Sequence, residues 1–247
     1  MKVKLGLLMM FLSLPALAEY RDALEGLPLD DSWSQLRFER SSLRALDVHD
    51  PLEPLNRRVY RFNSQLDRHV MVPMVRGYET VTPRFVRSGI RNLFANLADI
   101  PNLVNSLAQG KFEQGMRTTA RLLFNSTLGV AGLVDVAERM GLPQESEDFG
   151  QTLGYYGVPP GPYLVLPVLG PSNVRDAGGL LADWRVDRRL DLFGQQSLYR
   201  HHPETWALYV VDLRYNTPFR YGVLDSPFEY DQIRYLYLKL RQLQIQQ

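Results

Sequence analysis

The sequence predicts a mainly α-helical protein with one inserted segment rich in proline and glycine. Apolar residues recur every three or four positions along several stretches after residue 50, a spacing typical of amphipathic helices. Residues 141–171 hold six glycines and six prolines, so a continuous helix is not expected there. The 247 residues, 45% of them hydrophobic, are enough to bury a core as one domain.

The amino terminus has the features of a secretory signal peptide. Two lysines precede a short apolar run over residues 5–14, and residues 16–18 read Ala-Leu-Ala, a cleavage signal of the A-x-A kind. We therefore expect cleavage before Glu19 during export. The expected division of the chain is a signal peptide, a polar lead-in with room for one short helix, and a helical domain, over residues 1–18, 19–47 and 48–247.

The clearest amphipathic pattern begins at Asp50, where one face of the predicted helix is apolar and the other is polar. The apolar residues are Leu52, Leu55, Val59, Phe62, Leu66 and Val70, and the polar residues are Asn56, Arg57, Asn63 and Asp67. Pro73 is expected to end this helix, because proline lacks the backbone N–H that a helix interior needs.

Proline and glycine also mark the limits of the helices that follow. Pro83 opens a second predicted helix, Pro101 interrupts it and Gly110 closes it. Another helix is expected over residues 112–124. Within the insert, the apolar strip Tyr163–Leu166 lies between prolines. It fits a short strand, so the insert can hold a hairpin, and it fits an irregular loop as well.

The last third of the chain returns to a helical pattern. Ser172 is expected to cap the next helix, because serine is a favoured helix N-cap. A further helix ends before Pro218, and Ser226 with Pro227 starts the last one.

Composition excludes several classes of protein. Lys and Arg number 28 against 27 Asp and Glu, and so small a net charge disfavours a nucleic-acid-binding protein. The absence of cysteine excludes disulfides, thiolate zinc sites and a cysteine nucleophile. The longest apolar stretches fall short of the roughly 18 residues that a membrane-spanning helix needs.

Motifs for catalysis are also absent from the sequence. The chain has no P-loop, no G-x-G-x-x-G and no G-x-S-x-G, and no two of its four histidines have the helical spacing of a metalloprotease site. Asp183 and Asp187 lie four residues apart, but spacing alone is weak support for a glycosidase pair. We therefore expect no enzyme, no cofactor and no metal, and a function that is passive or powered by a partner.

Several sequence strings occur in the order in which they occur in one protein family. They are DPLEPLNR at 50–57, FANL at 94–97, NSTLG at 125–129, GQTLG at 150–154, GPYLVLP at 161–167 and RDAGG at 175–179. A Tyr-x-x-x-Arg-x-x-Tyr pattern follows at Tyr230, Arg234 and Tyr237. Through these strings, residues 47–240 resemble the MlaA (VacJ) family.

The resemblance implies a single-domain helical ring around an amphipathic channel, embedded in the inner leaflet of the bacterial outer membrane. Such a protein is a passive phospholipid channel. It removes mislocalised phospholipid from the outer leaflet and passes it to the periplasmic carrier MlaC, which maintains lipid asymmetry. The implied partners are phospholipid, this carrier and a trimeric porin, with no nucleic acid.

One feature departs from the family pattern. Many relatives are lipoproteins anchored through an acylated cysteine after the signal peptide, whereas this sequence contains no cysteine. We therefore expect an exported protein on the periplasmic side of the outer membrane that is not lipidated. Retention is then expected from the apolar exterior of the ring, the lead-in helix or the porin.

Resemblance and helix pattern together nominate three groups of residues. A gate is expected in the first strong helix, at Tyr60, Phe62 and Asn63. Candidates for the lipid path are Asn56, Arg57, Asn96, Asn125, Arg175 and Asp176. Candidates for contact with a partner are Trp206, Tyr209, Tyr230, Arg234 and Tyr237.

Each group also has a plainer interpretation. The asparagines fit helix caps or buried hydrogen-bond partners, and the aromatic residues fit an ordinary core. Two other functions stay open at this point. One is a periplasmic structural adaptor that docks on a porin without its own lipid path, and the other is a secreted hydrolase with an unrecognised site.

Overall fold

The computed structural model describes residues 50–191, 194–222 and 228–246. The chain divides into two compact units, Met1–Arg44 and Ala45–Gln247. The predicted signal peptide and lead-in lie outside the described residues, as does the predicted start of the last helix at Ser226 and Pro227. The described structure therefore belongs to the second unit.

This unit is mainly α-helical, which confirms the predicted fold class, and its described residues include one two-stranded sheet. The helices before the sheet are α3 (Glu53–Leu66), the π-helical turn η1 (Asp67–Met71), α4 (Val72–Val81), α5 (Arg84–Ala108), α6 (Phe112–Thr127), α7 (Val136–Arg139) and α8 (Phe149–Tyr155). The strands are β1 (Tyr163–Leu166) and β2 (Gly170–Asn173). The helices after the sheet are α9 (Val174–Leu190), α10 (Gln195–His201), α11 (Pro203–Asn216) and α12 (Glu229–Gln246).

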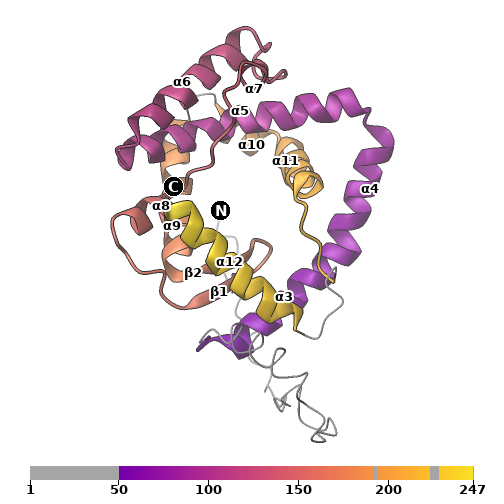
Figure 1. Ribbon diagram of the computed structural model, residues 1–247. Coiled ribbons are helices and arrows are strands. Elements are labelled where there is room, and N and C mark those ends of the chain that lie inside the picture. Colours follow the sequence, from indigo (N-terminus) through magenta and orange to yellow (C-terminus); the bar gives the residue numbers. More distant parts are fainter. Residues whose placement is uncertain (1–49, 192–193, 223–227, 247) are drawn as a thin grey trace, which may run out of the picture. The chain divides into compact units, whose positions relative to one another are not determined.

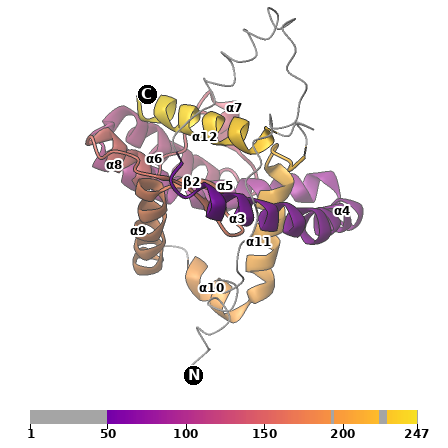
Figure 2. The same cartoon turned by 90° about the horizontal axis from the view of Figure 1, so that it is seen from below.

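The elements of this unit pack against one another in a closed circuit (Figure 1). α3 continues into η1 and α4, α4 packs on α11, and α11 packs on α5. α5 contacts α8, α8 contacts α12, and α12 packs on β2, whose partner strand β1 returns to α3. α6 lies along α5 and α9 along α8. In Figure 2, α9 and α11 stand across the layer that contains α3, α4 and α5. The circuit agrees with the helical ring that the resemblance implies.

The first long helix does not end at Pro73, so that prediction was wrong. α3 continues through η1 into α4, where Pro73 occupies the first turn. The backbone N–H of Val72 donates to the carbonyl of Asp67, five residues earlier, which is the π-helical register. Proline is tolerated in a first turn, where a backbone N–H has no obligatory partner, and the wider π turn lets the chain continue past it.

Pro101 does not interrupt its helix either, because α5 runs through it. A proline inside a helix removes one hydrogen bond and costs about 3 kcal/mol. Tertiary packing offsets this cost, since α6 lies along α5. A local sequence pattern contains no information on that support.

The segment rich in proline and glycine contains the hairpin, one of the two alternatives that the sequence left open, and a short helix that was not predicted. β1 pairs with β2 in antiparallel fashion, with Tyr163 opposite Asn173. The unexpected helix is α8, which begins after Asp148. The carboxylate of Asp148 accepts the backbone N–H of Gln151 at 2.9 Å. This N-cap allows one short helix to form in a segment where a long one cannot.

α9 is capped by Asn173 and not by Ser172, which lies in β2. The side-chain oxygen of Asn173 accepts the backbone N–H of Asp176 at 2.8 Å, so the cap falls one residue later than predicted. Gly179 brings α8 close to α9, because a Cβ at this position would lie 2.4 Å from the backbone nitrogen of Gly150.

The apolar core of this unit is small. Its two buried clusters are Val75 with Tyr78 and Val211, and Tyr163 with Val165 and Tyr230. Most other buried side chains are polar. Hydrogen bonds and ion pairs therefore position much of the fold, including the residues of the candidate site.

Candidate functional site

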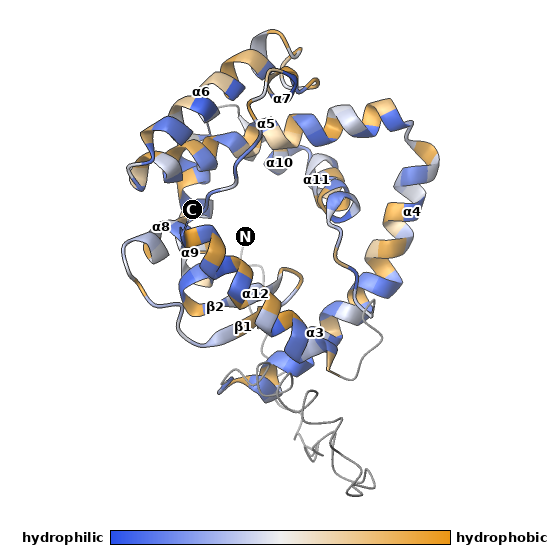
Figure 3. Cartoon of the chain, viewed as in Figure 1, coloured by the Kyte–Doolittle hydropathy of each residue, from blue (hydrophilic) through white to orange (hydrophobic). Residues whose placement is uncertain are grey.

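The described unit has a polar interior and an exterior rich in apolar side chains. Among the described residues, 22 buried side chains are polar or charged and 8 are hydrophobic, whereas 31 large hydrophobic side chains are exposed. Soluble domains show the opposite distribution. Figure 3 shows hydrophobic and hydrophilic segments alternating along α4, α5 and α6. So much exposed apolar surface indicates contact with a membrane or a partner.

Membrane-spanning helices and metal sites were sought among the described residues. No helix among them combines the length and the apolar character needed to cross a bilayer. No group of three or more His, Asp or Glu side chains in this part of the chain has an arrangement suited to a metal ion.

The three predicted gate residues lie on α3 in different surroundings. Asn63 is buried and holds the hairpin, because its Nδ2 donates to the Leu166 carbonyl at 2.9 Å and its Oδ1 accepts the Val168 N–H at 2.8 Å. Phe62 is 53% exposed, and Tyr60 is half-buried. Asn63 therefore faces the protein interior, whereas its neighbour Phe62 faces outward.

Asn56, a candidate for the lipid path, lies seven residues before Asn63 and binds the same hairpin. Its Nδ2 donates to the Tyr163 carbonyl at 3.0 Å, and its Oδ1 accepts the Val165 N–H at 2.9 Å. An amide side chain offers a donor and an acceptor together. It therefore pairs with a backbone carbonyl and a backbone N–H of β1, as a neighbouring strand would. The two asparagines share one face of α3 and fix β1 against it.

Arg57 lies where α3 meets α12. Its guanidinium pairs with Glu53 at 2.6 Å and with Asp231 at 3.0 Å, and it lies 4.3 Å from the centre of the Tyr230 ring. Burial lowers the pKa of Arg57, but hydrogen bonds and charge from the two carboxylates outweigh burial, so its pKa is raised. The partner-binding candidates Tyr230 and Arg234 are buried at this junction, at 4% and 3% exposure.

Asn96 and Asn125 lie where α5 packs on α6. Asn125 donates to Asp135 at 3.0 Å and accepts the Ala137 N–H at 3.0 Å, which closes the turn between α6 and α7. Asn96 donates to Ser126 at 3.2 Å. The Oδ1 of Asn96 is buried without a hydrogen-bond partner among the residues that the structure describes. Asn125 is thus fully used by the fold, and Asn96 retains one acceptor.

Arg121 is a buried charge that the sequence analysis missed. It is 1% exposed, and its guanidinium pairs with Asp99 at 3.1 Å and with Asp135 at 2.9 Å. Burial lowers the pKa of Arg121, but the two carboxylates outweigh burial and its pKa is raised. A signal existed in the sequence, since the polar residues Thr118, Arg121 and Asn125 recur at helical spacing on the face of α6 that is buried.

Arg175 and Asp176 belong to an ion-pair cluster that joins α8, α9 and α12. Asp176 accepts hydrogen bonds from Arg241 at 2.8 Å, Tyr237 at 2.7 Å and Arg175 at 2.9 Å. Arg241 also donates to both oxygens of Asp148, at 2.7 and 2.8 Å. Burial raises the pKa of Asp176, but the hydrogen bonds from Arg241 and Tyr237 outweigh it, so the pKa lies below its usual value. Tyr237, which was a candidate for partner binding, thus lies in the same cluster as the lipid-path candidates Arg175 and Asp176.

The remaining partner-binding candidates lie on α11. Trp206 is 55% exposed. Tyr209 is half-buried and packs against Phe94 and Tyr199, with ring centres 5.0 and 6.2 Å apart. The candidates on α11 and α12 therefore have different surroundings, and Trp206 is the one that is most exposed.

An acidic pair on α9 has raised pKa values. Asp183 accepts hydrogen bonds from Asn105 Nδ2 at 3.1 Å and from the Phe149 N–H at 2.9 Å. Burial raises the pKa of both Asp183 and Asp187, and the charge of Asp183 raises that of Asp187 further. Their spacing of four residues was visible in the sequence, but their burial was not.

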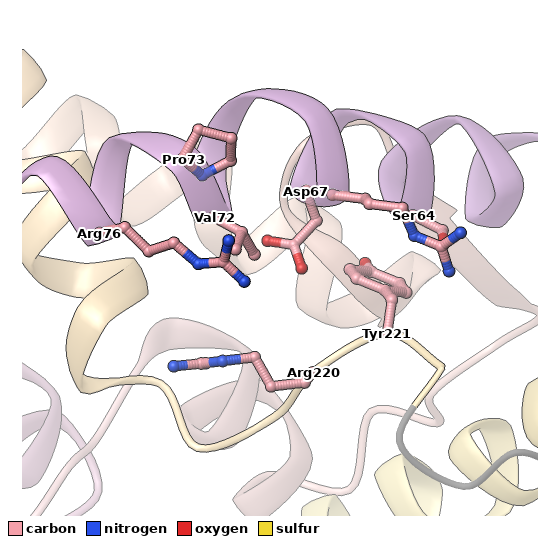
Figure 4. A pocket seen from close by; sticks show the side chains of 8 residues that line it. Ser64, Asp67, Val72, Pro73, Arg76, Arg220 and Tyr221 are labelled. Carbon is pink, nitrogen blue, oxygen red and sulfur yellow. The ribbon is translucent and has the colours of Figure 1, made fainter.

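A pocket of about 280 Å³ lies where η1 and α4 meet the segment after α11 (Figure 4). Its lining residues are Ser64, Asp67, Arg68, Val72, Pro73, Arg76, Arg220 and Tyr221. Asp67 is buried and paired with Arg214 at 2.8 Å. This pocket could not be predicted from the sequence, because Arg220 lies far along the chain from Arg68 and Arg76.

Comparison with known proteins gives the family of this chain. The family model described as "MlaA lipoprotein" matches residues 48–244. An uncharacterized protein of Rickettsia felis is 42% identical over 137 residues, which cover 56% of this chain and 55% of the relative. The intermembrane phospholipid transport system lipoprotein MlaA of Escherichia coli strain K12 is 40% identical over 139 residues, covering 54% and 55% of the two chains. The chain thus spans about half the length of the curated relatives it matches.

A solved structure shares the fold. It is described as the structural basis for maintenance of bacterial outer membrane lipid asymmetry. It matches with a TM-score of 0.68 and 30% sequence identity, and the match covers 80% of this chain and 100% of that chain.

The expectation that this protein is not lipidated is corrected by the same comparisons. The matching family is described as a lipoprotein family, and the Escherichia coli relative is named a lipoprotein. The expectation rested on the absence of cysteine from these 247 residues. It also rested on the cleavage signal before Glu19, and the lipoprotein descriptions of the family and of the relative overturn it.

The family model covers most of the chain, and the solved structure has the same arrangement of helices. The ordered strings from DPLEPLNR to RDAGG lie inside the matched region. On this evidence, the protein belongs to the MlaA lipoprotein family.

Proposed function

We propose that this protein takes part in the transport of phospholipid between membranes and thereby maintains the lipid asymmetry of the outer membrane. The observation that carries the proposal is the reversed polarity of the fold, with polar side chains buried and large hydrophobic side chains exposed. The name of the Escherichia coli relative and the subject of the matching structure support it.

A phospholipid needs two environments at once, which is the physical reason for this proposal. Its head group loses hydration in hydrocarbon, at a cost of several kcal/mol when its polar groups stay unpaired, whereas its acyl chains avoid water. Helices with an apolar outer face and a polar inner face offer both environments side by side. Such a protein lowers the barrier to head-group movement without an energy source. Consistent with this, the sequence holds no nucleotide-binding motif.

The finer proposal is a passive channel that takes mislocalised phospholipid from the outer leaflet and passes it to the carrier MlaC. The proposed lipid path includes Asn96, whose buried Oδ1 is not used within the described residues, and the ionic residues Arg57, Arg175 and Asp176. The proposed gate is α3 at Tyr60, Phe62 and Asn63. Its support is that Asn63 ties α3 to the hairpin, so movement of α3 displaces the hairpin as well.

A second candidate function is an adaptor that docks on a trimeric porin and has no lipid path of its own. One observation favours it: Asn56, Asn63 and Asn125 are engaged by hydrogen bonds within the protein. Under this alternative, the exposed Trp206 and the apolar exterior contact the porin.

Native mass spectrometry and a transfer assay separate these two functions. The full chain is purified in mild detergent, and transfer is measured from vesicles of phosphatidylethanolamine and phosphatidylglycerol to the soluble carrier. Channel function predicts mass increments of whole phospholipids and faster transfer than with porin alone. A protein that copurifies with porin, carries no lipid and leaves transfer at the porin-only rate is an adaptor.

A further inference from the structure

Three arginine side chains line the small pocket beside the π-helical turn. Arg68 lies in η1, Arg76 in α4 and Arg220 in the segment after α11. In Figure 4, the side chains of Arg76 and Arg220 extend into the same space beneath η1 and α4. Positive charges that share a cavity repel one another, so this arrangement favours an anion between them.

The charge of these arginines is not balanced by the carboxylate that lines the pocket. Arg214 binds both oxygens of Asp67, through Nε and through a second nitrogen at 2.8 Å. Within the described part of the chain, no carboxylate forms an ion pair with Arg68, Arg76 or Arg220. The pocket therefore carries a net positive charge.

Arg220 is positioned by the backbone around it. One nitrogen of its guanidinium donates to the carbonyls of Thr217 and Phe219, which leaves the other guanidinium nitrogens for a ligand. A planar guanidinium presents paired N–H groups that match the oxygens of a phosphate. The chemistry of the pocket thus fits a phosphate group better than a neutral polar ligand.

The size of the pocket restricts the ligand further. A volume of about 280 Å³ lies just below the range of about 300–1,000 Å³ that encloses a whole drug-sized molecule. It accommodates a phosphate with a small polar substituent and excludes a pair of acyl chains. Val72 and Pro73 supply an apolar wall, against which the first carbons of a glycerol backbone can lie.

Tyr221 connects the pocket to the predicted gate. Its ring packs against that of Tyr60 in α3, with centres 5.1 Å apart. Burial raises the pKa of Tyr221, and a hydrogen bond with Asn63 opposes this rise. A ligand in the pocket would therefore contact a tyrosine that touches two of the three proposed gate residues.

We propose that this pocket binds the phosphate group of a phospholipid head group, with Arg68, Arg76 and Arg220 as its ligands. The inference rests on the proposed transport function and names the place where the transported lipid is recognised. The acyl chains remain outside the pocket, against the apolar exterior of the protein.

Calorimetric titration of the full chain with glycerophosphoglycerol, a head group without acyl chains, tests the proposal. Arg68→Gln and Arg76→Gln are each expected to weaken binding about tenfold, because each removes hydrogen bonds to a charged group. Arg84→Gln and Arg139→Gln are matched controls. Arg84 and Arg139 are exposed and form no ion pair among the described residues. Both control variants remove the same charge and are expected to leave binding unchanged.

Separate titrations with glycerol and with inorganic phosphate identify the chemistry that is recognised. Glycerol is expected not to bind, and phosphate is expected to bind more weakly than glycerophosphoglycerol. Equal affinity for phosphate and glycerophosphoglycerol would assign a site for free phosphate and overturn the head-group assignment. Absence of glycerophosphoglycerol binding, or equal weakening in pocket and control variants, would overturn the site itself.

The transfer assay shows which of the two proposals has failed. If wild-type protein transfers lipid but does not bind glycerophosphoglycerol, the pocket proposal fails and the transport proposal stands. If it binds glycerophosphoglycerol in an arginine-dependent way but transfers no lipid, the transport proposal fails and the anion site stands.

Discussion

Arg121 illustrates, at the scale of single residues, how much the fold depends on buried charge. Replacing it by Met leaves Asp99 and Asp135 without their cation. The expected loss is about 3–5 kcal/mol in the free energy of unfolding, the usual effect of breaking a buried ion pair. Denaturant unfolding in detergent, followed by circular dichroism, measures it.

Arg117→Met is the matched control, one turn earlier on α6. Arg117 pairs with Glu113 at the surface, where the carboxylate side chain is 82% exposed. Solvent-exposed pairs contribute less than about 1 kcal/mol, so this variant is expected to unfold close to wild type. Equal losses for the two variants would show that the ion pairs of Arg121 do not stabilise the fold.

Asp187→Asn is expected to increase stability at neutral pH. Burial and the charge of Asp183 raise the folded-state pKa of Asp187 above its unfolded value, which is about 3.9. The folded protein therefore holds this proton more tightly, and stability falls as pH rises from about 4 through the raised pKa. Removing the charge abolishes that loss, so the variant gains stability at pH 7 and gains none below pH of about 4.

The size of this gain is expected to stay below about 1 kcal/mol, because solvent screens a half-buried group. Thermal unfolding at pH 7 and at low pH measures it. Glu79→Gln, at an exposed position on α4, serves as the control and is expected to show no such pH dependence. A variant that is destabilised at pH 7 would mean that Asp187 accepts a stabilising hydrogen bond.

At the scale of elements, a deletion within α3 tests the proposed gate. Deleting Phe62 and Asn63 removes the two hydrogen bonds that Asn63 makes to the hairpin and rotates the residues that follow by roughly 200°, at about 100° per residue. Asp67 then turns away from Arg214, with which it pairs. We expect the deletion to let phospholipid reach the cell surface and to damage the membrane barrier even when wild-type protein is present.

Barrier permeability and surface-exposed phospholipid, measured in cells that carry both copies, check this prediction. Phe62→Ala is the control, because it changes a side chain that is 53% exposed and shifts no residue along the helix. If the deletion variant is made at normal levels and behaves as a recessive null, the gate proposal is wrong.

At the scale of the whole second unit, α12 closes the circuit of packed elements. Its Tyr230 and Arg234 are buried, and its Arg241 joins α8 to α9 through Asp148 and Asp176. A chain that ends after Pro227 would leave both carboxylates without this cation. We therefore expect the truncated protein to lose its cooperative unfolding transition as well as any partner binding.

Limited proteolysis and circular dichroism of the truncated protein measure this outcome, with removal of residues 246–247 alone as the control. A truncated protein that stays folded but no longer copurifies with porin would instead make α12 a docking element.

Local sequence features determine several parts of this structure. The apolar period of three or four residues predicted the helices. The apolar strip Tyr163–Leu166 between prolines fitted a strand and a loop equally, and the structure has the strand. Local pattern was misleading at Pro73 and Pro101, where the helix continues. Whether a proline stops a helix depends on its position in a turn and on support from other elements, and spacing reveals neither.

What the sequence determined by itself was the two-faced character of the helices and, through its ordered strings, the family. Only the tertiary structure decided which face is buried. The spacing of apolar residues shows that a helix has two different faces, but not which face packs against the interior. It also decided the ionic contacts, such as Arg57 with Asp231 and Arg241 with Asp148. These pairs form between residues far apart in the chain, and no local spacing relates them. The arginine pocket has the same origin, since η1, α4 and the segment after α11 meet only once the circuit has closed.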